Sequence, residues 1–270
     1  MISLSDHREV PVSRTSAANT RDSVELRLLG RFELSIGDRP VPVGWNGQRL
    51  LAFLAMSAGV ATRDSLARAL WPDAPAHRLH PSLRSVLWRL RRCCSPALES
   101  SVTELRLADH VLVDVLMSTD VARQLLDRSA PVSQEQLRLA MRANLREDLL
   151  PTWVDEEWIA ADRERFRQLR LHSLELLCEQ LTAARWHGAA IDSGLASVAA
   201  DPFRESARRV LIKAYLAEGN FHLAISEFNN YRKLIRDELK CRPSQELRGM
   251  LGAEIEFTAL NGSVIRRRST

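Results

Sequence analysis

The sequence predicts a mainly α-helical protein with a small β part, divided into two domains. Three observations support this prediction. Apolar residues alternate with polar ones from Val24, a helical period takes over after Gly44, and the chain has helical periodicity throughout from Thr119 onward. A chain of 270 residues, 45% of them apolar, is long enough to bury two hydrophobic cores.

The domain boundaries are expected where this pattern changes. Residues 1–22 are polar and aperiodic, so they are expected to form a disordered arm. Residues 23–116 are predicted to form the first domain and residues 117–258 the helical second domain. Residues 259–270 are expected to be a disordered basic tail, because they are polar and include three consecutive arginines.

The first domain begins with a predicted antiparallel sheet. Residues 24–28 and 32–36 alternate apolar and polar side chains, as strands do, and Gly30 and residues 37–40 supply the turns. Residues 41–43 are expected to add a short third strand.

Two predicted helices follow this sheet and form a helix-turn-helix. The first has an apolar face from Leu50 to Met56 and is expected to end near Gly59. The second begins after Thr62, a good N-cap, and Pro72 stops it.

A proline-containing loop is expected to lead from the second helix to a third, over residues 82–94. Residues 102–107 and 111–115 are then expected to pair as a hairpin around residues 108–110. Sheet, three helices and hairpin is the element order of a winged helix with an N-terminal sheet.

The third helix carries the strongest functional signal. Its apolar residues recur at helical spacing (Leu83, Val86, Leu87 and Leu90), so its other face is free. Five arginines and no acidic residue lie between His77 and Arg92, a local charge of +5 against +4 for the whole chain. Since arginine binds guanine bidentately and pairs with phosphate, this face favours DNA binding over a merely solvated surface.

The candidate DNA contacts extend beyond this face. Arg49 and Arg63 lie near helix starts and Thr103 and Arg106 in the hairpin, where phosphate contact and solvated surface explain them equally well. Trp88 either contacts a thymine methyl or sugar or packs half-buried against the hairpin, and the packing role is favoured. The full set is Arg49, Arg63, Arg78, His80, Arg84, Ser85, Trp88, Arg89, Arg91, Arg92, Thr103 and Arg106.

No catalytic or metal chemistry is indicated. The sequence has no phosphate-binding loop, dinucleotide fingerprint, nucleophile elbow or zinc-protease motif, so the protein is predicted not to be an enzyme and to need no cofactor. His77 and His80 lack further ligands at suitable spacing, and Cys93 and Cys94 have no assigned role. No signal peptide or membrane span is recognisable, which predicts a cytoplasmic protein.

The second domain is predicted to contain tetratricopeptide-like helix pairs. Its candidate helices span residues 119–128, 133–146, 155–186, 188–200, 204–218, 220–239 and 244–257. Ala190 and Ala224 are separated by 34 residues, the period of this repeat, and Pro202 follows Ala190 by twelve. Such pairs stack into surfaces that hold a peptide, a partner domain or another protomer.

Taken together, these stretches resemble the Streptomyces antibiotic regulatory protein family, in which a response-regulator-type winged helix precedes a bacterial transcriptional activator domain. The resemblance covers about residues 24–257. It rests on segments that are weak singly but specific in their order: residues 28–30, 48–51, 66–72, 90–92, 112–115, 149–153, 157–158, 163–165, 169–172, 201–205, 219–220, Tyr231 and 243–244.

The resemblance implies a sequence-specific activator of secondary-metabolite, or antibiotic, gene clusters. It implies binding to direct repeats of double-stranded DNA near the −35 element as a homodimer, and recruitment of RNA polymerase holoenzyme through its sigma and alpha subunits. It also implies a nucleoid-associated location and a polymerase-facing loop made of Pro72, Asp73, Ala74, Pro75, Ala76, His77 and Leu79.

The sequence departs from the family pattern at several positions. Pro81, Val86 and Trp88 stand where the family often has asparagine, histidine and serine, which affects which bases are read. Lys240 replaces the usual glycine after Leu239, so the helix there is expected to end without an easy left-handed residue. Two alternatives stay open: a tetratricopeptide scaffold whose winged helix binds protein or is only structural, and a repressor using the same DNA contacts.

Overall fold

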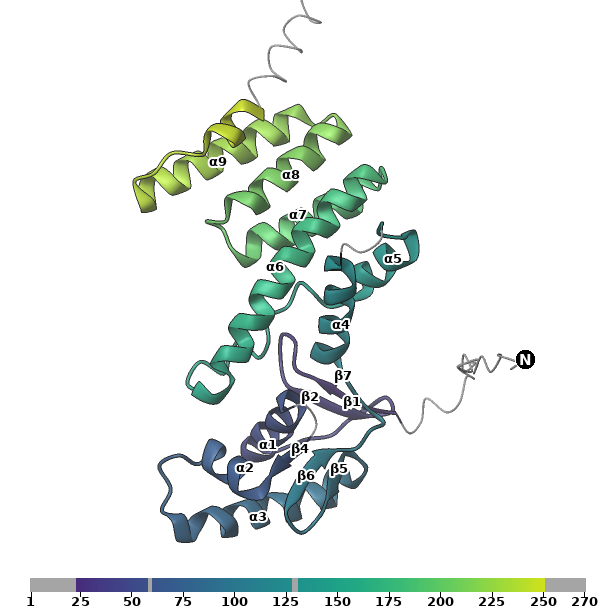
Figure 1. Cartoon of the computed structure of the whole chain (residues 1–270), viewed down its shortest axis with the longest axis vertical. Helices are drawn as coiled ribbons and strands as arrows, with labels where there is room; N and C mark the ends of the chain where they lie inside the picture. The colour runs from purple at the N-terminus through teal and green to yellow at the C-terminus, as the bar shows by residue number, and fades with distance from the viewer. Residues whose placement is uncertain (1–22, 58–59, 128–130, 251–270) are drawn as a thin grey trace, which may run out of the picture. The chain divides into compact units, whose positions relative to one another are not determined.

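The computed structural model describes residues 23–57, 60–127 and 131–250, which fall into two compact units (Figure 1). The first unit contains the described residues up to Leu26 together with Glu33–Leu112. The second contains Arg27–Phe32 and the chain from Val113 onward. The arm and tail expected at residues 1–22 and 259–270 lie outside the described residues.

The N-terminal sheet has four strands in the order β3-β2-β1-β7. They are β1 (Val24–Arg27), β2 (Glu33–Ile36), β3 (Arg39–Pro40) and β7 (Val111–Val113). The prediction of a third strand at residues 41–43 is wrong. Gly37 has a φ of 56°, which permits a tight turn, so pairing resumes at once with Ile36 opposite Arg39.

Three helices follow as predicted in order: α1 (Trp45–Met56), α2 (Arg63–Leu70) and α3 (Ala76–Cys94). The Thr62 hydroxyl accepts a hydrogen bond from the Ser65 N–H at 3.2 Å, which confirms the predicted N-cap of α2. Ser57 caps α1 at its C-terminus, while the helix end expected near Gly59 falls outside the described residues.

Helix α3 starts at Ala76, six residues before the predicted position, and contains Pro81. The prediction that Pro81 belongs to the loop is therefore wrong. Proline fixes φ at a helix-compatible value, but inside a helix it removes the hydrogen bond to the carbonyl of residue i−4, here the exposed His77, and crowds that carbonyl. Leu79, one turn before Leu83, is buried, and this burial favours the longer helix.

The hairpin after α3 differs from the predicted one. Strand β6 (Glu104–Leu107) lies between β4 (Val60–Thr62) and β5 (Leu98–Ser100), whereas β7 joins the N-terminal sheet. The expected pairing of residues 102–107 with 111–115 is therefore wrong. Alternation identifies strands but not their partners, and Ser101 closes the β5–β6 turn by accepting N–H bonds from Thr103 and Glu104 at 3.3 and 3.0 Å.

The second unit is helical. Its helices are α4 (Asp114–Leu126), α5 (Gln134–Arg142), the short η2 (Glu157–Ile159), α6 (Ala160–Ala183), α7 (His187–Ala200), α8 (Glu205–Glu218) and α9 (Phe221–Leu239). Residues 245–250 are also helical. Helix α4 begins five residues before the predicted Thr119, and α6 to α9 stack in chain order (Figure 1).

The repeat geometry agrees with the 34-residue spacing. Ala190 in α7 and Ala224 in α9 are both fully buried, so each is the small residue at a close helix contact. Gly219 ends α8 with a φ of 90°. Lys240 ends α9 in the same left-handed region, with a φ of 57°, so a lysine here adopts a conformation that only glycine adopts without strain.

Residues 27–32 are held inside the second unit. The Asp114 carboxylate accepts N–H bonds from Leu28 and Leu29 at 2.8 and 3.0 Å. Leu28 in turn accepts from the Leu150 N–H at 2.9 Å, and the Gly30 N–H donates to the Asp148 carbonyl at 2.8 Å. Burial raises the pKa of Asp114 from its ordinary value, whereas the hydrogen bonds that Asp114 accepts from Leu28 and Leu29 lower that pKa.

Candidate nucleic-acid interface

Helix α3 has one buried and one exposed face. The predicted apolar stripe is buried in full, together with Leu79 and Cys94 at its two ends. The opposite face exposes every DNA-contact candidate of this helix: Arg78, His80, Arg84, Ser85, Trp88, Arg89, Arg91 and Arg92. The helix is therefore anchored along its whole length while its basic face meets solvent.

The arginines of this face are not neutralised by the described chain. Arg78, Arg84 and Arg89 form no ion pair with any described residue, and the sequence has no acidic residue between Asp73 and Glu99. Their guanidinium groups are available to external anions, with five donors each.

Trp88 is 60% exposed, so the favoured packing against the hairpin is wrong. Its indole instead faces the Arg92 guanidinium, whose carbon lies 4.9 Å from the ring centroid. The side chain that reaches the hairpin is Arg91, which donates to the Ser100 hydroxyl at 2.6 Å. Arg91 and Arg92 are thus held in place at the helix end.

The candidates of the hairpin behave differently from those of α3. Arg106 is paired with Glu99, its register partner on β5, and with Asp109 at 3.2 Å. Thr103 is exposed at the β5–β6 turn. Arg63 donates to the Ser101 carbonyl at 3.0 Å, so it ties α2 to that turn.

The two remaining DNA-contact candidates are His80 and Arg49. His80 Nε2 lies 3.0 Å from Asp64 Oδ1, which links α3 to α2. Arg49 is partly buried on α1. These contacts depend on which elements are neighbours, so no sequence signal indicated them.

The predicted polymerase-facing loop is shorter than expected. Of the predicted loop residues, only 72–75 lie between α2 and α3, whereas Ala76, His77 and Leu79 belong to the first turns of α3. Leu79 is buried and its side chain is unavailable to a partner. Pro72, Asp73 and Pro75 are exposed and Ala74 is partly exposed.

No group of three His, Cys, Asp or Glu residues with metal-binding geometry occurs among the described residues. No described helix is both long and apolar enough to span a bilayer.

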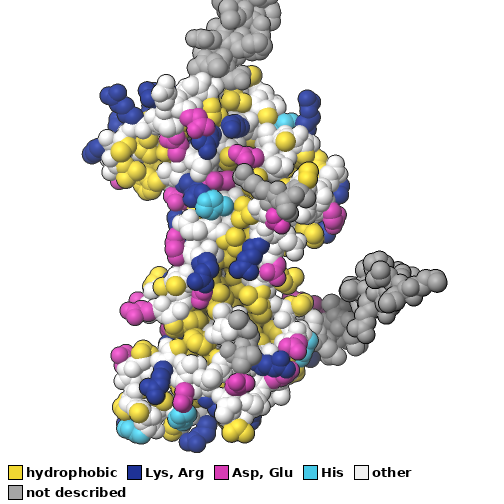
Figure 2. Space-filling model, viewed as in Figure 1, with side chains coloured by type: hydrophobic (Ala, Val, Ile, Leu, Met, Phe, Trp, Pro, Cys, Tyr) yellow, Lys and Arg dark blue, Asp and Glu magenta, His cyan; other side chains and the backbone are white. Residues whose placement is uncertain are grey.

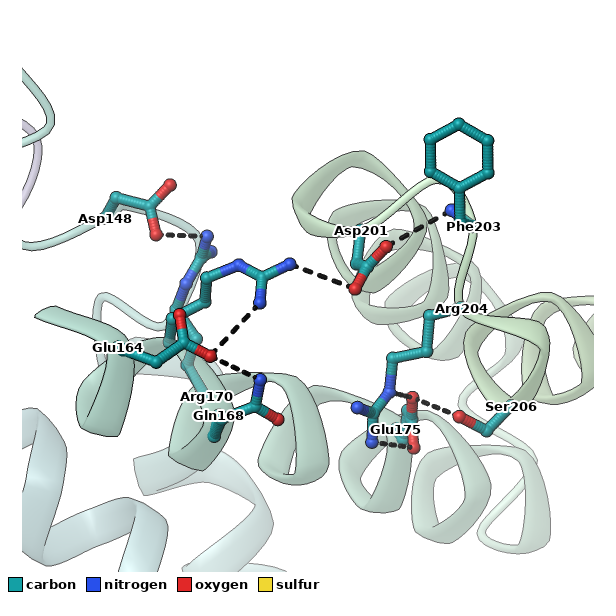
Figure 3. Close-up of polar contacts among 10 residues, drawn as sticks. Asp148, Glu164, Gln168, Arg170, Glu175, Asp201, Phe203, Arg204 and Ser206 are labelled. Carbon is teal, nitrogen blue, oxygen red and sulfur yellow. Dashed lines mark hydrogen bonds and ion pairs between the residues drawn. The ribbon is translucent and has the colours of Figure 1, made fainter. Parts of the chain in front are cut away.

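Several arginines of the second unit are paired internally (Figure 3). Arg170 donates to Asp148 Oδ1 at 2.5 Å and to the Arg146 carbonyl at 3.0 Å. Arg204 pairs with Glu175 at 2.5 Å, and Glu175 also accepts from Ser206. On the face of this unit seen in Figure 2, basic and acidic side chains are intermixed. Helix α3, in contrast, contains no acidic residue.

A model of the bacterial transcriptional activator domain matches residues 117–255, which is 139 of the 270 residues. The chain belongs to this family, and with its N-terminal winged helix it is a transcriptional regulator of the Streptomyces antibiotic regulatory protein type. This confirms the resemblance inferred from the sequence segments.

Curated relatives match along most of the chain. Transcriptional regulatory protein MoaR1 of Mycobacterium bovis is 25% identical over 277 residues, which cover 93% of this chain and 86% of MoaR1. Regulatory protein AfsR of Streptomyces griseus is 26% identical over 252 residues, which cover 88% of this chain but only 25% of AfsR.

A solved structure has the same fold. Mycobacterium tuberculosis EmbR, in complex with a low affinity phosphopeptide, aligns with a TM-score of 0.59 and 21% identity. The alignment covers 87% of this chain and 65% of the EmbR chain, so this chain spans somewhat less than two thirds of that protein. The agreement confirms the fold class predicted from the sequence.

Proposed function

We propose that this regulator is a sequence-specific activator that binds double-stranded DNA through the exposed face of α3. The observation that carries the proposal is the row of arginines on that face, which have no carboxylate partner among the described residues. Phosphate and guanine supply the anionic and bidentate acceptors that such side chains lack inside the protein.

Different residues of the α3 face are proposed to contact the bases and the DNA backbone. Arg84 and Arg89, near the middle of the exposed face, read base edges together with Ser85. Arg91 and Arg92, held by Ser100 and Trp88, bind phosphates. The remaining candidates are proposed as weaker flanking contacts: Arg49, Arg63, Arg78, His80, Trp88, Thr103 and Arg106.

Selection from a pool of randomised DNA duplexes tests this proposal. The wild-type chain is expected to enrich a defined sequence, and Arg84→Ala or Arg89→Ala to relax the preference at one position each. Arg123→Ala removes an exposed arginine from α4 and is the matched control, since it changes the net charge equally. No detectable DNA binding at low salt would overturn the proposal.

The finer proposal is that two protomers lie side by side on direct repeats near a −35 element and recruit RNA polymerase. We propose the short segment of residues 72–75 as a contact for the sigma or alpha subunit, because it is exposed and lies beside the DNA-reading helix in the chain. Asp73→Ala is expected to reduce transcription by purified holoenzyme while leaving DNA affinity unchanged. An equal loss of both would contradict this role.

The proposed targets are promoters of a secondary-metabolite cluster, with the protein acting in the cytoplasm at the nucleoid. Footprinting on the DNA that flanks its own gene tests both points, since the spacing of protected repeats reports the target and the number of protomers. Protection of a single half-site would contradict the homodimer.

Repression through the same contacts, or a scaffold role of the stacked helices, are the competing functions. Deletion of the gene separates them from activation. Loss of target transcripts supports an activator, a rise identifies a repressor, and no change together with absent DNA binding identifies a scaffold.

A further inference from the structure

Two adjacent cysteines meet at the C-terminal end of α3. Cys93 Sγ and Cys94 Sγ are 3.7 Å apart, which is van der Waals contact. Consecutive side chains on a regular helix point about 100° apart because there are 3.6 residues per turn. Contact arises here because Cys94 leaves the helical conformation, with φ of −145° and ψ of 43°, where the chain passes into the short helix η1 (Ser95–Ala97).

The two thiols have different surroundings. Cys93 is exposed and lines two open pockets of about 330 and 820 Å³. Cys94 is fully buried and its Sγ lies 3.2 Å from the Leu90 carbonyl oxygen. Burial, and then the neighbouring Cys93, raise the pKa of the Cys94 thiol to about 12. A small molecule therefore reaches Cys93 first, and the buried Cys94 is in contact with Cys93.

We propose that Cys93 and Cys94 form a reversible redox modification site, which low-molecular-weight disulfides convert to an intramolecular disulfide. The Cys93 thiolate attacks a sulfur of the reagent, forms a mixed disulfide and releases one thiolate of the reagent. Cys94 then loses its proton to solvent and attacks Cys93 Sγ, which expels the second thiolate. Two protein thiols thus transfer two electrons to one reagent disulfide, which leaves as two thiols.

The Cys93–Cys94 disulfide is expected to be easily reduced. Adjacent Cα atoms are about 3.8 Å apart, below the roughly 4.4–6.8 Å of ordinary disulfides, so the bond is strained and readily reduced. Closure also draws Cys94 Sγ away from Leu90 and disturbs the last helical turn. That turn carries Arg91 and Arg92, so oxidation is expected to weaken DNA binding; this consequence alone rests on the proposed function.

The other cysteines of the chain serve as controls. Cys241 is exposed and Cys178 is buried in the second unit, and both are free. Cys178 is fully buried, so a dissolved disulfide does not reach it. A Cys241→Ser background removes the second accessible thiol without touching the first unit.

Treatment with oxidised glutathione tests the site by intact mass and by thiol titration after denaturation. In the Cys241→Ser chain we expect the loss of two hydrogen atoms and of two titratable thiols, both reversed by dithiothreitol. Adding Cys94→Ser is expected to trap a single glutathione on Cys93. A persistent glutathione adduct when Cys93 and Cys94 are both present, or no reaction at Cys93, would overturn the proposal.

DNA affinity measured on the same samples tests the consequence. Oxidation is expected to lower the affinity several-fold, with recovery under dithiothreitol and no loss in the Cys93→Ser variant, which has no exposed thiol in the Cys241→Ser background. Unchanged affinity after the disulfide has formed would refute the regulatory effect. If the reduced chain binds no DNA, the proposed function fails, whereas the mass measurement still decides the modification site.

Discussion

The arginines of α3 and several arginines of the second unit differ in burial and in pairing with carboxylates. Arg170, Arg204 and Arg208 are largely buried, and each is paired with a carboxylate. Arg84 and Arg89 are exposed and have no such partner among the described residues. The protein contains only three lysines among its 38 basic residues, so arginine abundance itself carries no functional information.

Pairing therefore marks the structural arginines, whereas the proposed DNA-binding face of α3 is marked by several exposed, unpaired arginines that occur together without an acidic residue. A buried guanidinium must satisfy several donors, so removing it leaves unpaired acceptors and reduces stability. An exposed guanidinium without a partner stabilises the fold little, so removing it affects only what binds from outside.

The largest expected effect is on folding, from Arg170→Ala. Arg170 is 1% exposed and bonds Asp148 and the Arg146 carbonyl, so its loss is expected to reduce the free energy of unfolding by about 2–4 kcal/mol. Urea denaturation measures this. The control is Arg165→Ala, whose exposed pair with Asp162 is expected to contribute below about 1 kcal/mol. Equal losses in the two variants would remove the distinction between buried and exposed pairs.

The next effect is on DNA, from Arg89→Ala or Arg84→Ala. Each is expected to weaken binding to the selected site by about 1–3 kcal/mol, because a bidentate base contact is lost. Urea denaturation is expected to give wild-type stability for both variants, since neither side chain has a charged partner within the described chain. Unfolding at lower urea with unchanged DNA affinity would reverse the assignment.

Asp114 is an acidic group whose carboxylate is held by backbone N–H donors instead of a charged partner. Asp114→Asn places an amide N–H₂ against one of the three backbone N–H groups that the carboxylate accepts, so a loss of about 1–2 kcal/mol in stability is expected.

The pH dependence of that loss has a definite sign. The folded-state pKa of Asp114 is raised, so its protonation favours the folded state below the ordinary value of 3.8, and that contribution is lost as pH rises through the folded pKa. The wild-type advantage over Asp114→Asn should therefore grow as pH is lowered from 7 toward 4. An advantage that shrinks over this range would contradict the pKa shift.

A smaller effect is expected at Lys240, a basic residue whose backbone matters more than its charge. Its φ of 57° is in the left-handed region that glycine adopts without strain. Lys240→Gly is expected to raise the free energy of unfolding by about 0.5–1 kcal/mol, despite losing the bond from Nζ to the Asp237 carbonyl. Lys240→Ala removes the same bond without relieving the strain, and should not stabilise.

The smallest effect is expected at Arg106, which is exposed yet already paired with Glu99 and Asp109. Arg106→Ala should change DNA affinity by less than about 0.5 kcal/mol, because its charge is neutralised within the hairpin. Binding measured beside Arg89→Ala provides the scale. A loss as large as that of Arg89→Ala would mean that pairing does not decide function here.

Local signals in the sequence predicted much of the fold. The Thr62 cap located the start of α2, and the 34-residue spacing of Ala190 and Ala224 located the repeated helices. The apolar stripe of α3 indicated which face is buried. Each depends on neighbours within one or two helical turns or on a repeat period, which are properties that the sequence displays directly.

What was missed depends on contacts between elements. The partners of β6 are set by the tertiary arrangement, and the pairing of Arg106 with Glu99 follows from that strand register. The exposure of Trp88 depends on where the hairpin lies, and Arg91 takes the position expected for the indole. Candidate residues were therefore identified by type, whereas their free or paired state required the structure.

The most direct test of the central claim is the salt dependence of DNA binding in the wild type, Arg92→Ala and Arg123→Ala. We predict that Arg92→Ala lowers the magnitude of the slope of log K against log salt by about 0.9, one phosphate contact, while Arg123→Ala leaves it unchanged. Identical slopes for all three proteins would contradict the claim that the basic face of α3 contacts the DNA backbone.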